Sequence, residues 1–130
     1  MMNIEHKQIN FNIQAKPLTV NKAWVGGRRF RSPEYKSFEK EIAYFLPKIT
    51  VKGEVEIRYK FYIKNYNRTD VSNLIKILED ILVANGIIED DRFVKKFSAE
   101  KFKNDNESIQ ILIKQYERLR WRFRKSDRRK

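Results

Sequence analysis

Apolar and polar residues alternate in two segments of the chain, and this period of two predicts β-strands. The first runs from Gln8 to Ala15, with asparagine and glutamine between the apolar positions. The second runs from Glu54 to Lys64 and places five large apolar residues on one face, so each strand is expected to bury one side. Two further strands, Phe93 to Phe102 and Ser108 to Gln115, are predicted on either side of the turn Asn104-Asp105-Asn106.

Two other segments keep helical spacing. Ser32-Pro33 is typical of an N-cap followed by proline at the first helical position, and the helix is expected to end at Pro47. A second helix is expected from Asp70 to the Asn85-Gly86 turn. Its apolar stripe, which we expect to face the core, comprises Leu74, Ile77, Leu78, Ile81 and Leu82.

The predicted order of elements is β-α-β-α-β-β-β, in which the third strand is the short segment Ile87 to Asp91. Lys16 to Arg31 is expected to be a loop. This order indicates a mixed α/β (α+β-like) domain with one mixed sheet of about four to five strands and two main helices. A length of 130 residues fits one such domain, followed by a basic C-terminal segment.

The net charge of +12 and the pI of about 10.0 favour an anionic partner, either nucleic acid or an acidic membrane surface. From Lys114 to Lys130 the chain has nine basic residues against two acidic ones, so this segment supplies +7 of the total. No apolar run is long enough to span a membrane and no secretory signal is present, so we expect no membrane association.

The composition also excludes several kinds of chemistry. With no cysteine, the chain has no disulfide, no thiolate zinc site and no cysteine nucleophile, which suits a cytoplasmic protein. With His6 as the single histidine, a Ser-His-Asp triad and a histidine zinc site are disfavoured. There is no P-loop and no G-x-G-x-x-G, so no nucleotide cofactor is expected.

The segment Thr69 to Asp91 contains two acidic clusters that a fold-back would bring together. A helix of about 15 residues is roughly 22 Å long, and an extended return from Ile87 to Asp91 covers roughly 16 Å. If the chain reverses at Asn85-Gly86, Asp91 is expected near the start of the helix, beside Asp70. Carboxylates gathered in so basic a chain suggest a divalent metal acting on a phosphate backbone.

One flank of the same helix carries a polar line of Asn73, Lys76 and Asp80. Lys76 could neutralise charge on a phosphorane-like transition state or on the leaving oxygen, or it could orient the attacking water. Structural alternatives exist for each acidic residue. Asp70 could be a simple N-cap, Lys76 and Asp80 a surface pair, and Glu89-Asp90-Asp91 a solvated turn.

The pattern D-V-S-N-L-x-K-x-x-x-D-x-L followed by N-G-I-x-x-D-D-x-x-V resembles the RusA-type Holliday junction resolvases. The segments K-P-L-T-V-N-K and R-S-P-E-Y also lie where that family has its N-terminal strand, loop and helix. The resemblance covers about residues 7 to 115. It divides the chain into a RusA-like nuclease domain, residues 1–115, and a basic C-terminal tail, residues 116–130.

The resemblance implies a homodimeric endonuclease that requires Mg²⁺, with Mn²⁺ as a substitute, and nicks branched DNA symmetrically in recombination and repair. By position, Asp70, Lys76 and Asp91 are the catalytic residues. Asn73 and Asp80 are supporting residues. The implied metal ligands are Asp70, Asp91, Asp90 and Ser72, of which Ser72 stands where the family often has an acid and brings no negative charge.

Basic residues outside this motif are expected to contact DNA. The loop residues Arg28, Arg29 and Arg31 lie near Trp24 and Phe30, a mixture suited to clamping phosphates and stacking on bases. Lys101 and the tail arginines Arg118, Arg120, Arg122 and Arg124 are also predicted contacts. A solvated loop, a basic dimer-packing segment and a disordered tail remain the structural alternatives.

Three hypotheses about function follow. The first is a metal-dependent, structure-selective endonuclease that resolves four-way junctions. The second is a catalytically weak or inactive junction-binding protein, in which Ser72 marks a decayed site. The third is a basic RNA-associated module whose acidic residues are structural.

Overall fold

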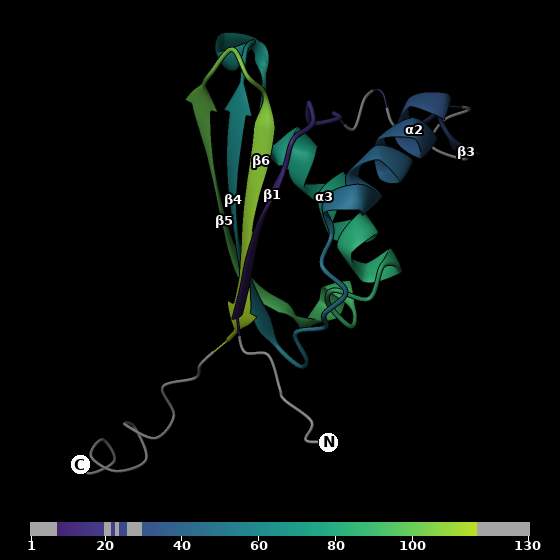
Figure 1. The fold of residues 1–130 in the computed structure, drawn as a ribbon, viewed down its shortest axis with the longest axis vertical. Helices are drawn as coiled ribbons and strands as arrows, with labels where there is room; N and C mark the ends of the chain where they lie inside the picture. The colour runs from purple at the N-terminus through teal and green to yellow at the C-terminus, as the bar shows by residue number, and fades with distance from the viewer. Residues whose placement is uncertain (1–7, 20–21, 23, 26–29, 117–130) are drawn as a thin grey trace, which may run out of the picture.

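The computed structural model describes residues 8–19, 22, 24–25 and 30–116. Its main sheet has four strands in the order β1-β6-β4-β5, and two helices, α2 and α3, lie on the same side of it (Figure 1). This is the mixed α/β architecture that the sequence predicted, with four strands in the main sheet. The strands are β1 (Gln8–Ile13), β4 (Val55–Ile63), β5 (Val94–Lys103) and β6 (Ser108–Gln115).

Strand β4 lies between β5 and β6 and pairs with both. It is parallel to β5 and antiparallel to β6, while β6 is also antiparallel to β1. Parallel neighbours need a crossover connection. Here the crossover contains the short 3-10 helix η2 (Tyr66–Arg68) and helix α3 (Ser72–Ala84). The polar motif of the sequence therefore lies on the connection between the two parallel strands.

Helix α2 (Pro33–Ile42) begins as the sequence predicted. The Ser32 hydroxyl accepts a hydrogen bond from the Tyr35 backbone N–H at 3.0 Å and donates one to the Lys22 carbonyl at 2.5 Å. Pro33 occupies the first turn, where its missing N–H costs nothing. The helix continues as the 3-10 turn η1 (Ala43–Phe45) before Pro47.

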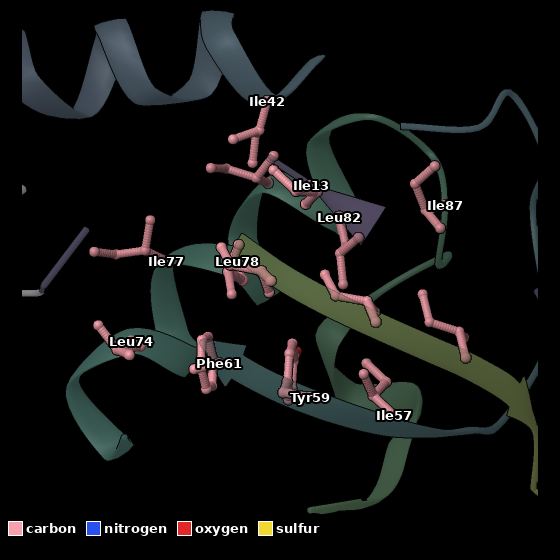
Figure 2. Close-up of a cluster of buried hydrophobic side chains, with 14 of the residues drawn as sticks. Ile13, Ile42, Ile57, Tyr59, Phe61, Leu74, Ile77, Leu78, Leu82 and Ile87 are labelled. Atoms are coloured by element: carbon pink, nitrogen blue, oxygen red, sulfur yellow. The ribbon is translucent and has the colours of Figure 1, made fainter. Parts of the chain in front are cut away.

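Helix α3 packs its apolar stripe against the sheet (Figure 2). All five stripe residues predicted from the sequence are at most 2% exposed, and so are the five alternating apolar residues of β4. Figure 2 shows Leu74, Ile77, Leu78 and Leu82 of the helix above Ile57, Tyr59 and Phe61 of the strand. This shared core fixes which flank of α3 is left for polar residues.

Three local predictions were wrong. The segment Ile87 to Asp91 is not a strand, because only one bridge, between Val51 and Ile88, forms there. Helix α3 starts at Ser72 rather than Asp70. The expected loop contains a two-stranded sheet of β2 (Trp24–Val25) and β3 (Phe30–Arg31). Within the described residues, no helix is long and apolar enough to cross a membrane.

Replacing Tyr59 with phenylalanine is expected to raise the free energy of unfolding. The Tyr59 hydroxyl is buried without a hydrogen-bond partner among the described residues, and burial raises its pKa well above the ordinary value of 10.0, so it stays neutral. A buried polar group without a partner costs about 1–3 kcal/mol. Urea unfolding should show the gain, while Tyr44→Phe, at a position 86% exposed, should change little. A clear loss of stability in Tyr59→Phe would show that the hydroxyl has a partner.

Candidate active site

The ammonium of Lys76 lies between two carboxylates that come from different elements. Lys76 Nζ is 3.2 Å from Asp80 Oδ1, one turn further along α3, and 3.7 Å from Asp91 Oδ2. The hydrogen bond with Asp80 raises the pKa of Lys76, and the charge of Asp91 raises it further. Lys76 is therefore a protonated cation at neutral pH, and its side chain remains 57% exposed.

The adjacent acids Asp90 and Asp91 have different roles in the structure. Asp90 precedes the 3-10 turn η3 (Asp91–Phe93), and its Oδ1 accepts a hydrogen bond from the Arg92 backbone N–H at 3.1 Å. That hydrogen bond is the main cause of the lowered pKa of Asp90. Asp90 is thus used as the cap of a turn, whereas Asp91 turns its carboxylate toward Lys76.

Asp70 lies just before α3, and its carboxylate contacts the hydroxyl of Ser72. Ser72 Oγ donates to Asp70 Oδ1 at 3.4 Å. The interpretation of Asp70 as an N-cap is wrong, because Val71 is the capping residue and no side chain accepts a capping hydrogen bond there. The Asp70 carbonyl instead accepts the backbone N–H of Asn73 at 3.0 Å. The Asp70 carboxylate is exposed and bonded only weakly within the chain.

The metal ligands that the resemblance implies, Asp70, Ser72, Asp90 and Asp91, stay a prediction. Among the described residues, no three or more histidine, cysteine, aspartate or glutamate side chains are placed to hold a metal ion. Asp91 meets α3 at Lys76, whose ammonium is 3.7 Å from Asp91 Oδ2. The return segment ends in the 3-10 turn η3, whose first residue is Asp91. The cation that its carboxylate contacts is the Lys76 ammonium.

Glu79 is a fourth charged residue of this group, and the sequence interpretation missed it. Its side chain is half-buried on α3, and burial raises its pKa. Lys76 opposes that rise, while Asp91 and Asp80 add to it. Its spacing three residues after Lys76 is a possible signal, but only the packing of α3 on the sheet shows that the carboxyl is partly desolvated.

We expect Glu79→Gln to raise the free energy of unfolding at pH 7 and to lose this effect in acid. The native pKa of Glu79 lies above its ordinary value of 4.5, so the native state binds the proton more tightly than the unfolded chain. The free energy of unfolding of the wild type therefore falls as pH rises from the unfolded-state pKa of Glu79 to its higher native-state pKa. Urea unfolding at several pH values should show that Glu79→Gln is more stable than the wild type at neutral pH. This difference should vanish below about pH 4, where Glu79 is protonated in both states. A gain of equal size at every pH would contradict a titrating cause.

The predicted DNA contacts are only partly described. Arg31 pairs with Glu39 at 3.5 Å and lies over the Tyr35 ring, 4.7 Å from its centre. Lys101 donates to the backbone carbonyls of Tyr66 and Thr69, so its ammonium is used inside the chain. The other predicted contacts lie outside the described residues: Arg28, Arg29, Arg118, Arg120, Arg122 and Arg124.

Comparison with protein families adds the decisive observation to this geometry. Residues 12–114 match the RusA family of endodeoxyribonucleases. The chain belongs to the RusA family. The match spans both helices, the motif on α3 and all of β4 and β5, and it confirms the resemblance seen in the sequence. A comparison with individually curated proteins finds no matching relative.

Membership in the RusA family implies a nuclease that resolves Holliday junctions in DNA recombination. RusA resolvases are generally dependent on divalent metal ions. Lys76, Asp80 and Asp91, which the structure brings together, lie within the matched RusA region, and so does Asp70.

Proposed function

We propose that this protein is a structure-selective DNA endonuclease that resolves four-way junctions by paired symmetric nicks in recombination and repair. The single observation that supports this site is the Lys76 ammonium held by Asp80 and Asp91 within a RusA-family domain. We assign the catalytic roles to Asp70, Lys76 and Asp91, with Asn73 and Asp80 in support.

Lys76 is suited to act on a phosphodiester. Its charge is maintained by two carboxylates, and its exposed side chain can approach a phosphate from solution. An ammonium beside the scissile phosphate stabilises the negative charge that develops there, and such electrostatic contributions are large. Asp80 keeps the ammonium in place, and exchange of Asp91 for a phosphate oxygen would bring the cation onto the substrate.

We include in the proposal a requirement for Mg²⁺ or Mn²⁺, a homodimer and a cytoplasmic, DNA-associated location. The metal requirement rests on the general behaviour of RusA resolvases. Paired nicks on opposing strands need two active sites, which a symmetric dimer supplies.

The test is cleavage of a synthetic four-way junction by the full chain, compared with a linear duplex of the same sequence. We expect symmetric nicks in the junction with Mg²⁺ or Mn²⁺, none with EDTA, and little cutting of the duplex. Equal cutting of both substrates would contradict structure selectivity. Cutting that continues in EDTA would contradict the metal requirement.

A junction-binding protein with weak or no nuclease activity is the second candidate. The observation in its favour is Ser72, whose hydroxyl donates to Asp70 where the family often carries another acid. The described residues also contain no group of three acids placed for a metal. Selective binding of the junction without nicks in either metal would favour this candidate over the first.

A further inference from the structure

A basic concavity lies at the end of the sheet from which the chain enters the Asp70 motif. It measures about 220 Å³, and no acidic residue lines it. In Figure 1 this is the upper end of the sheet, where β4 and β5 both finish. Its lining is Lys64, Asn65, Tyr66, Asn67, Arg68 and Lys103.

Three backbone carbonyls of this turn, those of Asn65, Tyr66 and Thr69, accept hydrogen bonds within the chain. Lys101 Nζ donates to the carbonyls of Tyr66 at 2.6 Å and Thr69 at 3.0 Å, and it lies 4.3 Å from the centre of the Tyr66 ring. The Asn65 carbonyl accepts the Thr69 hydroxyl at 2.8 Å and the Arg68 N–H at 3.1 Å. These contacts hold the turn in one shape and offset the carbonyl dipoles that would repel an anion.

The cations of the lining are not neutralised. In the described part of the chain, Lys64, Arg68 and Lys103 form no ion pair with an acidic side chain. Lys103 Nζ bonds only a neutral carbonyl, that of Lys64, at 3.3 Å. A nearby carboxylate, Glu107, accepts the backbone N–H of Lys64 at 3.1 Å and leaves the Lys64 ammonium unpaired.

Three unpaired cations and two side-chain amides in a preformed concavity suit a phosphate group, because charge-assisted hydrogen bonds to an anion are strong. Arg68 precedes Asp70 by two residues, so an anion bound here lies close to the proposed active site.

We propose that this concavity binds a backbone phosphate of the DNA strand that passes Asp70. Lys64, Arg68 and Lys103 contact the phosphate, and Lys101 is a positioning residue that holds the turn. The proposal rests on the proposed action on DNA, and it assigns to the Tyr66–Arg68 turn a site that fixes the strand relative to the catalytic residues.

The test is the salt dependence of junction binding by the double variant Arg68→Gln/Lys103→Gln, measured by fluorescence anisotropy in EDTA so that no cleavage occurs. The matched control is Lys48→Gln/Lys52→Gln, which removes two charges from exposed positions in the α2–β4 connection. Loss of one phosphate contact should lower the slope of log K against log salt concentration by about 0.9. Affinity should fall about ten-fold at moderate salt, and the control should stay within about two-fold.

Equal slopes and affinities in the two double variants would overturn the site. That outcome is separate from failure of the nuclease proposal. If the wild type cuts junctions and the two double variants bind them with equal slope and affinity, the nuclease proposal stands and the phosphate site fails. If the wild type never cuts junctions but the salt slope is lower in Arg68→Gln/Lys103→Gln and unchanged in the control variant, the phosphate site stands and the nuclease proposal fails. Circular dichroism melting of both variants checks that each is folded.

Discussion

Replacing Asp91 with asparagine is expected to abolish nicking of four-way junctions while leaving junction affinity largely intact. Asparagine keeps the shape of the side chain but removes the negative charge of a proposed metal ligand, which contacts Lys76 at 3.7 Å in the free protein. Loss of one electrostatic group at a reacting centre typically costs a factor of about 10²–10³ in rate. Affinity should hold because the carboxylate is itself anionic and gives no attraction to a phosphate.

The measurement is single-turnover cleavage with Mg²⁺, together with anisotropy of the same junction in EDTA. Asp70→Asn is expected to behave in the same way. Glu41→Gln, at an exposed position of α2, removes the same charge away from the site and should cut at the wild-type rate. If Asp70→Asn and Asp91→Asn also cut at that rate, the assignment of the site is wrong.

Leu78→Ala is expected to lower the free energy of unfolding by about 2–5 kcal/mol, because truncating a buried leucine loses its transfer energy and leaves a cavity. Leu78 is 2% exposed on α3, facing the sheet (Figure 2). A domain of this size has a total stability of only about 5–15 kcal/mol, so a large share would be lost. Activity at higher temperature should fall with it, since α3 carries Lys76.

Urea unfolding gives the measurement. Leu78→Met conserves volume and should cost less than about 1.5 kcal/mol. Tyr44→Ala removes a larger side chain from a position that is 86% exposed, and it should stay within about 0.5 kcal/mol of wild type. A loss in Leu78→Ala no larger than that in Tyr44→Ala would mean that α3 does not contribute to the core as described.

The sequence predicted the local elements because their signals are local. Alternation at β4 and helical spacing at α3 identify buried faces without any knowledge of neighbours, and the Ser32 cap depends on only four consecutive residues. The contact between Lys76 and Asp80 was also predictable, since residues four apart on a helix are adjacent. The motif that resembled RusA resolvases was a linear pattern, and the family match confirmed it.

Other features had no local signal. The burial of Glu79 depends on the sheet beneath α3. The predicted DNA contact Lys101 has its ammonium on the carbonyls of Tyr66 and Thr69, more than thirty residues earlier in the chain. The basic concavity forms only because the end of β5 lies beside the η2 turn. Each of these features depends on which segments meet in space.

The sequence by itself therefore determined the two main helices, the four long strands, their buried faces and the family, because periodicity and residue order are properties of a linear chain. The tertiary structure decided where β4 lies between β5 and β6 and where Asp91 meets α3. The sequence predicted an extended return segment. The observed segment forms a single bridge and then the turn η3. The conformation of such a short segment is selected by the packing and hydrogen bonding of the whole domain.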